Sequence, residues 1–476
     1  MITNRRIRII ISLILAASVI SFSACTQKSS TAALSGSDTT TAAATASTSS
    51  TAPEASDSGQ MSINGKPSGG APGGNAPGGN APGGSQSIDT GTGAYVVTDG
   101  ESLSGNTYTS TNADENAVRA ESTATASLDG VTVEKTGGSA SSSDASSFYG
   151  LNSAILALDN ATLNITGGTV TATAEGANGV FAYDGATINI TGTVINVTGG
   201  NAGGIEVSGG GIMNATDLTV HSTVKAAIRS DRGGGTMTVN GGTYTTGGSS
   251  GAPAIYSTAD ITASNAVLTA NSSEAVVVEG LNSVTLNNCS VTGNMTGTYG
   301  EASSKNIHNV MLYQSMSGDA ETGTSSFTMT GGSLVSKNGD MFYVTNTDCV
   351  IALNGVTLTP ADGTNLLTVS GNDGSNGWGT AGKNGGTCAF NLTKQTLSGD
   401  IIVDAISNLA MTISDSSSFT GSINSDKTNA ASLSVTLDTA STWTLTADSY
   451  ITSFTGSMNN VVTNGYTLYV NGTAMK

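Results

Sequence analysis

The chain has 476 residues, of which 63 are glycine and only 11% are charged. Beyond the N-terminus no convincing amphipathic helix is evident, so the composition predicts an all-β protein rather than a helical or mixed α/β one. The formal net charge of −18 would repel nucleic-acid phosphates and anionic membrane surfaces, and it argues against nucleic acid as a partner.

Residues 1–24 have the organisation of a secretion signal. Three arginines within residues 5–8 form a positive segment, and the apolar run 9–20 is too short to span a bilayer. Residues 22–25 read Phe-Ser-Ala-Cys, which resembles the lipobox of bacterial lipoproteins apart from phenylalanine in place of the usual leucine. This resemblance implies an exported protein that is lipidated at Cys25 and anchored to the cell membrane or surface. The alternative is a plain signal peptide with an incidental cysteine.

Residues 25–93 are low in complexity. They are first rich in serine, threonine and alanine, and then repeat Ala-Pro-Gly-Gly from Ala71 onward. Such a segment cannot bury enough apolar surface to fold, and proline with paired glycines favours a mobile, extended chain. We therefore expect a disordered tether between the anchor and the folded part.

From about residue 94 to residue 476 a short strand pattern recurs, in which a small residue precedes an aliphatic one and alternation follows. The aliphatic position falls at Val118, Ile155, Val180, Ile205, Ile228, Ile255 and Val277. A second alternating strand follows in most units, as at 161–165 and 186–190, and a third often follows that. Repeats of this size indicate stacked coils, each burying its apolar edge against its neighbours. Asn164 and Asn189 are expected to stack as an amide ladder.

In coil period and strand pattern, residues 94–476 resemble the right-handed parallel β-helix proteins of the pectate-lyase-like superfamily. The resemblance implies an all-β, right-handed parallel β-helix solenoid. The last stretch, about 432–476, lacks a successor in the repeat, so we expect it to cap the apolar end, with Trp443, which alternates with Leu445, in the capping core. The resemblance implies little about activity, because the Gly-His-Gly and paired-Asp motifs of the pectin hydrolases in that superfamily are missing.

Stacking the coils in register predicts two outward columns around the charged stretch 228–232. The first column is Arg119, Leu156, Phe181, Glu206, Arg229, Tyr256 and Val278; the second is Glu121, Leu158, Tyr183, Ser208, Asp231 and Thr258. Neighbouring parallel strands lie about 4.8 Å apart, which places Glu206 beside Arg229.

These columns permit three interpretations. One is a surface ladder of ion pairs, each worth about 0–1 kcal/mol when exposed. Another is a carbohydrate-binding face, because aromatic rings and planar charged groups hold sugars. Its candidate residues are Phe181, Tyr183, Glu206, Arg229, Asp231, Arg232 and Tyr256, with Trp378 in a glycine-rich loop as a further platform.

The third interpretation is catalysis by Glu206, Asp231 and Arg229. The two carboxylates would lie roughly 8 Å apart, within the separation of an inverting glycosidase. Uronate lyases of the resembled superfamily instead hold Ca²⁺ with clustered acidic residues, for which Asp159 and Asp184 would be added, and use an arginine base. Beyond this weak Ca²⁺ possibility, the sequence predicts no metal site and no cofactor.

Three further cysteines follow Cys25, namely Cys289, Cys349 and Cys388. The last two each precede the same apolar alternation, so we expect small core residues stacked in neighbouring strands, while a disulfide among the three stays open. The two histidines, His221 and His308, belong to no recognisable constellation.

Together these patterns favour an exported, lipid-anchored, adhesin-like β-helix protein that binds polysaccharide or a glycan of a host or neighbouring cell without catalysis. A polysaccharide lyase or glycoside hydrolase of the pectate-lyase-like superfamily is the first alternative. A structural surface spacer without a ligand is the second.

Overall fold

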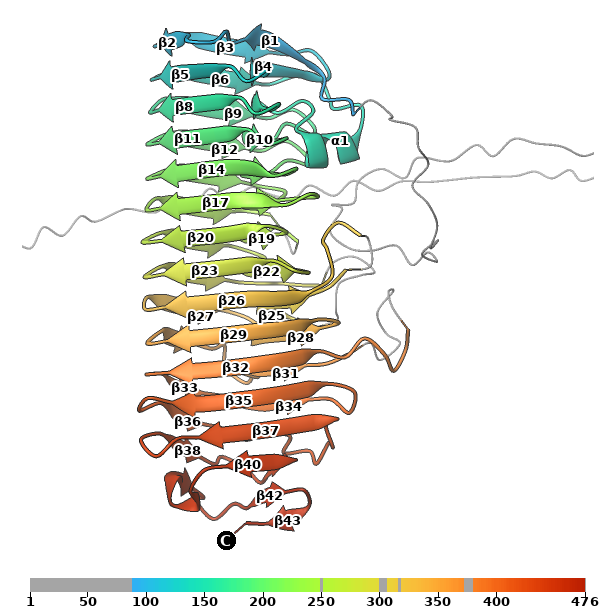
Figure 1. The fold of residues 1–476 in the computed structure, drawn as a ribbon, viewed down its shortest axis with the longest axis vertical. Helices are drawn as coiled ribbons and strands as arrows, with labels where there is room; N and C mark the ends of the chain where they lie inside the picture. Colours follow the sequence, from blue (N-terminus) through green and yellow to red (C-terminus); the bar gives the residue numbers. More distant parts are fainter. Residues whose placement is uncertain (1–87, 249–250, 299–305, 316–317, 372–379, 476) are drawn as a thin grey trace, which may run out of the picture. The chain divides into compact units, whose positions relative to one another are not determined.

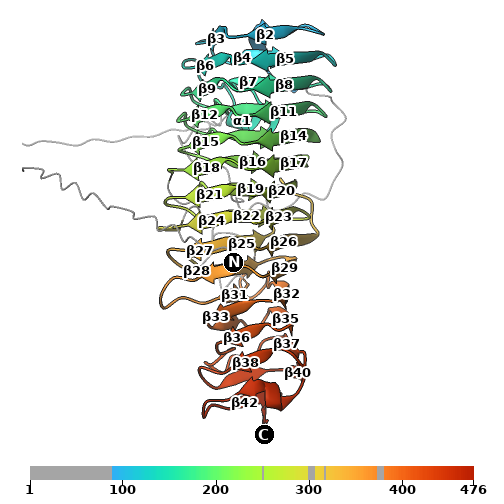
Figure 2. The same ribbon diagram turned by 90° about the vertical axis from the view of Figure 1, so that its left-hand side faces the viewer.

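The computed structural model describes residues 88–475, apart from 249–250, 299–305, 316–317 and 372–379. Within these residues the chain winds as a right-handed parallel β-helix, as expected, and its coils stack in chain order (Figure 1). Each early coil contributes one strand to each of three parallel sheets, called here A, B and C (Figure 2). Cys25 and Trp378 lie outside the described residues.

Sheet A carries the predicted charged columns. Its twelve described strands are β1 (Thr92–Val96), β4 (Glu115–Ala120), β7 (Ile155–Ala157), β10 (Val180–Ala182), β13 (Ile205–Val207), β16 (Ile228–Ser230), β19 (Ile255–Ser257), β22 (Val276–Glu279), β25 (His308–Tyr313), β28 (Asp340–Thr345), β31 (Leu367–Val369) and β34 (Ile401–Val403).

Sheet B follows sheet A in each coil and is the longest of the three. Its fourteen described strands are β2 (Ser102–Ser104), β5 (Thr125–Asp129), β8 (Thr162–Thr166), β11 (Thr187–Thr191), β14 (Gly211–Thr216), β17 (Gly235–Asn240), β20 (Asp260–Ser264), β23 (Ser283–Asn287), β26 (Thr324–Thr330), β29 (Asp348–Asn354), β32 (Thr387–Thr393), β35 (Asn408–Ser414), β37 (Ser432–Leu437) and β40 (Ser453–Thr455).

Sheet C completes the early coils. Its ten described strands are β3 (Thr107–Ser110), β6 (Thr132–Lys135), β9 (Thr169–Ala172), β12 (Val194–Val197), β15 (Thr219–Ser222), β18 (Thr243–Thr246), β21 (Val267–Ala270), β24 (Ser290–Gly293), β27 (Ser333–Ser336) and β30 (Thr357–Thr359).

Two small sheets close the C-terminal end. One contains β33 (Thr396–Ser398), β36 (Ser418–Thr420), β38 (Thr442–Thr444) and β41 (Val461–Val462); the other contains β39 (Ser449–Ile451), β42 (Leu468–Val470) and β43 (Thr473–Ala474). Strands β42 and β43 pair antiparallel, so the last turn departs from the coil. Trp443 is fully buried there, stacked on Phe419 and donating its indole N–H to the carbonyl of Gly421, as a capping core residue should.

Alternating strand residues point inward and form one continuous apolar core, because a β-strand sends successive side chains to opposite faces. The pairing register agrees with the sequence through Ile255 and then differs by one residue. Ile255 pairs with Val276, so Val277 is an outward residue and takes the column position expected for Val278. The run 275–278 reads Ala-Val-Val-Val, and without alternation the pattern cannot fix the register.

The expected amide ladder is confirmed on the outer face of sheet B. Asn189 donates to the side-chain oxygen of Asn164 at 2.9 Å, and Asn214 donates to that of Asn189 at the same distance. Cys349 and Cys388 also pair in register on β29 and β32, and both are buried, as predicted for stacked core residues.

One element contradicts the expectation that no helix follows the N-terminus. Helix α1 (Ser143–Tyr149) lies between β6 and β7, within the longest spacing of the repeat. Ser142 caps its first turn by accepting a hydrogen bond from the amide of Ala145, and Gly150 ends it in the left-handed conformation. At two turns the helix is too short to show an amphipathic period, which is why the pattern missed it.

Candidate functional site

The two predicted columns lie on the outer face of sheet A, but much of this face is buried. Phe181 and Glu206 are 0% exposed, and Arg229 and Asp231 are each 3% exposed. Tyr183 and Tyr256 are partly buried. Phe181 therefore has no ring face open to a sugar, and the charged residues do not form the exposed ion-pair ladder that one interpretation required.

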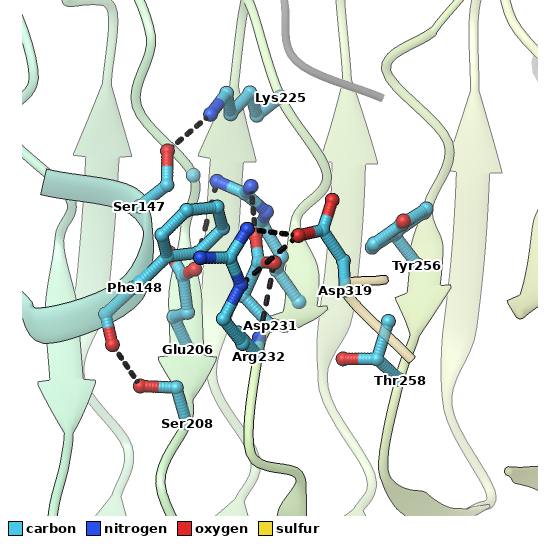
Figure 3. A network of polar contacts seen from close by, with 12 residues as sticks. Ser147, Phe148, Glu206, Ser208, Lys225, Asp231, Arg232, Tyr256, Thr258 and Asp319 are labelled. Carbon is cyan, nitrogen blue, oxygen red and sulfur yellow. Dashed lines mark hydrogen bonds and ion pairs between the residues drawn. The ribbon is translucent and has the colours of Figure 1, made fainter. Parts of the chain in front are cut away.

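Helix α1 covers part of this face, beside Glu206 and Ser208 (Figure 3). Ser208 donates to the carbonyl of Phe148 at 2.6 Å, and Lys225 donates to the hydroxyl of Ser147 at 2.7 Å. The ring of Tyr149 packs edge-on against Tyr183 at 5.5 Å. The helix is thus held onto sheet A by hydrogen bonds from two coils and by aromatic contact.

Arg229 joins the two carboxylates that the sequence placed near it. Its Nη1 lies 3.5 Å from Oε1 of Glu206, and its Nη2 forms an ion pair with Oδ2 of Asp231. Neither oxygen of Glu206 accepts a hydrogen bond within the described structure, so this carboxyl is the less satisfied of the two. The predicted neighbours therefore meet, but in a buried structural network.

Burial shifts the protonation of this network. Burial raises the pKa of Glu206 to about 8, against the opposing effect of Arg229. Burial also lowers the pKa of Lys225 to about 7. Burial raises the pKa of Asp231 too, although Arg229 and Lys225 oppose the shift. Near neutral pH the carboxyl of Glu206 is therefore mainly protonated and neutral, and Lys225 is only partly charged.

Tyr256 belongs to a second buried cluster one coil further along. Its hydroxyl donates to Oε2 of Glu279, which also accepts from the hydroxyl of Tyr313 at 2.9 Å. Ser315 donates to the other oxygen of Glu279. Burial raises the pKa of Tyr256 well above its ordinary value. The Tyr256 hydroxyl is thus used inside the protein rather than offered to solvent.

Arg232 is the member of the charged stretch that reaches solvent, with its side chain 45% exposed. Its guanidinium pairs with Asp319, a residue 87 positions later, and lies 3.9 Å over the ring of Phe148. Figure 3 shows Arg232 between α1 and Asp319. It therefore links the helix to the segment that follows β25.

A pocket of about 420 Å³ opens beside Arg232. It is built from the corners between sheets A and B in four successive coils, those that follow β16, β19, β22 and β25. Its lining residues are Arg232, Gly233, Gly234, Thr258, Leu281, Asn282, Gly318, Asp319, Ala320 and Glu321. The volume lies within the range of small-ligand sites, and the lining combines charged, amide and hydroxyl groups with one exposed leucine.

Thr258 contributes to this pocket a side-chain hydroxyl that forms no hydrogen bond within the described structure. Its side chain is 3% exposed and lines the pocket. A buried hydroxyl without a partner costs free energy. The Oγ1 oxygen of Thr258 has almost no accessible surface, so a ligand hydroxyl would reach it only after the Thr258 side chain rotates toward the pocket.

The sequence predicted Arg232 as a site residue and placed Thr258 in the second outward column. It did not identify four other residues that line the pocket, namely Asp319, Glu321, Asn282 and Leu281. These residues lie in corners whose lengths differ between coils, so no periodic signal brings them together. Among the described residues no group of three or more acidic, histidine or cysteine side chains is placed to hold a metal ion. Asp159 and Asp184 are corner residues in the left-handed conformation.

The geometry defines this molecule as a parallel β-helix protein with a buried charged network and an adjoining polar pocket. Comparisons of the chain with protein-family models, with curated proteins and with solved structures found no match. The described part of the chain also contains no helix with the length and apolar character to cross a bilayer.

Proposed function

We propose that the protein is an exported, lipid-anchored β-helix protein that binds a glycan in the pocket beside Arg232, without catalysis. The observation that carries this proposal is the partnerless Thr258 hydroxyl in a pocket of sugar-binding chemistry. Arg232, Asp319 and Asn282 supply groups that hydrogen-bond ring hydroxyls, and Leu281, 53% exposed, supplies an apolar surface for the C–H face of a sugar.

The buried network supports binding over the catalytic alternative. A glycosidase needs two carboxyl groups on either side of the scissile bond, and a lyase needs a base at the substrate. Glu206 and Asp231 are instead buried against one guanidinium, that of Arg229. A polysaccharide lyase or hydrolase of the pectate-lyase-like superfamily would have to open this network before either carboxylate could reach a substrate.

Binding is tested with the full chain carrying Cys25→Ser, which removes lipidation, on a glycan array and on insoluble polysaccharides. Thr258→Val keeps the side-chain shape and removes the hydroxyl, and we expect it to weaken binding about three- to tenfold. Thr262→Val on the outer face of β20 is the matched control and should leave affinity unchanged. No retention of the parent protein on any glycan, or an equal loss in both variants, would reject the proposal.

The same samples distinguish the alternatives. New reducing ends or unsaturated products that disappear in Glu206→Gln or Asp231→Asn would establish an enzyme. A protein that binds no glycan and cleaves none, while keeping its fold, would support the structural spacer.

Export and anchoring rest on the N-terminal sequence alone. In a bacterial host the natural chain should incorporate labelled fatty acid and partition with membranes, whereas Cys25→Ser should do neither. A label that persists in Cys25→Ser would refute the assigned anchor.

A further inference from the structure

The neighbouring strands β29 and β32 place two thiols against each other in the core. Cys349 and Cys388 are register partners, and both side chains point into the core. Both cysteines are free thiols in this structure. Adjacent strands in a parallel sheet lie about 4.7–4.9 Å apart, which falls inside the Cα separation of about 4.4–6.8 Å found in disulfides.

Cys289 has no such neighbour and provides an internal comparison. The register of β21, β24 and β27 places Ala266 and Gly332 at the equivalent positions of the adjoining coils. Its sulfur contacts only backbone carbonyls among the described contacts, those of Ala263 and Asn287. All three thiols are buried, so their difference lies in pairing and not in access.

We infer that Cys349 and Cys388 are the site of an inter-coil disulfide that forms when the chain folds in an oxidising compartment. The oxidant is a disulfide of a small thiol or of a thiol oxidoreductase. One cysteine thiolate attacks that disulfide to give a mixed disulfide and releases a thiol. The other cysteine thiolate then attacks the mixed disulfide, so that one S–S bond forms in the protein and the oxidant leaves as two thiols.

The fold determines when this exchange is fast. The neighbouring thiol of Cys388, followed by burial, raises the pKa of Cys349 well above its ordinary value, so little thiolate exists in the folded state. The folded, reduced protein should therefore react slowly, and oxidation should occur before these coils close.

The test refolds the full chain carrying Cys25→Ser from denaturant in a glutathione redox buffer. Peptide mapping without reduction should recover the Cys349 and Cys388 peptides as one linked species, lighter than the two reduced peptides by two hydrogens. Cys289 should remain alkylatable in the same sample. Cys289→Ser should leave the linked species intact, and Cys349→Ser should abolish it.

The stability of the oxidised and the reduced protein gives a second test of the disulfide. This test needs no cysteine variant, so it does not depend on whether such a variant folds. The oxidised protein should unfold at higher urea concentration than the same sample after reduction. Complete alkylation of all three cysteines after oxidative refolding, or a linkage that includes Cys289, would overturn the inference. These results are independent of glycan binding, so failure of one proposal leaves the other standing.

Discussion

Arg229 organises the outer face of sheet A at the scale of single residues. It compensates two buried carboxyl groups that would otherwise be desolvated without a partner. A buried ion pair adds little net stability compared with apolar residues, but removal of one partner is costly because the remaining charge is stranded. Arg229 and Asp231 are therefore better understood as the support of the adjoining pocket, and Arg232 is the member of the charged stretch that lines it.

This view predicts the effect of Arg229→Met on stability. The variant should lose about 3–5 kcal/mol of unfolding free energy, because Asp231 then loses the guanidinium with which it forms its ion pair. Lys394→Met is the control, since Lys394 pairs with Asp415 at the exposed surface, where the loss should stay below about 1 kcal/mol. Urea denaturation of both variants measures the difference. Equal losses would show that the Arg229 network is not a buried one.

The pKa of Glu206 predicts a pH dependence with a definite sign. Because its folded pKa, about 8, lies above the ordinary value of 4.5, the contribution of this group to stability is complete below about pH 4.5 and is lost as pH rises towards 8. Glu206→Gln removes this titration. The stability of the variant relative to the parent should therefore rise across pH 4.5–8 in urea denaturation, and a constant difference would show that burial does not raise the pKa of Glu206.

At the scale of elements, α1 and the corners between sheets A and B create features that the strands alone do not have. The helix covers Leu156 and Phe181, which form a small apolar cluster separate from the main core. The corners vary in sequence and length while the strand registers stay fixed, so insertions can build the pocket wall without disturbing the coil.

Substitution of Gly150 tests how closely the C-terminal end of α1 packs against sheet A. Gly150 and Gly130 both have positive φ, of 75° and 60°, so alanine at either costs about 1–2 kcal/mol of backbone strain. A β carbon at Gly150 would also lie 2.5 Å from Leu156 and 3.1 Å from Phe181, whereas at Gly130 it would meet nothing within 4 Å. Gly150→Ala should therefore destabilise the protein more in thermal unfolding. Equal effects would mean that α1 does not pack closely here.

For the molecule as a whole, stability should be distributed coil by coil, because each coil contacts mainly its neighbours. Long-range order arises from the repeated registers of sheets A, B and C, along which one continuous apolar core extends from coil to coil. A destabilising substitution at one end of the β-helix should therefore lower the stability of the nearby coils and leave distant coils unchanged.

The variant Trp443→Ala tests whether stability is distributed coil by coil. Loss of the buried indole should cost about 3–5 kcal/mol, and its hydrogen bond to Gly421 disappears with it. Hydrogen exchange should accelerate in β36, β38 and β41, while β8 and β11 keep their protection. A uniform acceleration from β8 to β41 would instead indicate a single cooperative unit.

The repeating strands of this structure could be predicted from the sequence, whereas helix α1 and the corners between strands could not. Alternation predicted the sheets, the neighbours of Arg229 and the Cys349–Cys388 pair, because a period of two fixes both face and register. It could not predict that the outer face of sheet A is buried, since α1 is a short insertion. It also could not predict that Asp319 contacts Arg232, because the corner between β25 and β26 differs in length from the corners of the neighbouring coils.

The most direct measurement of the central claim is the crystal structure of the protein with a glycan that it retains in the binding assay. The account predicts ring density in the pocket between Thr258 and Arg232, with a ligand oxygen within hydrogen-bond distance of the Thr258 hydroxyl. Glycan density on another face, with the pocket filled only by water, would contradict it.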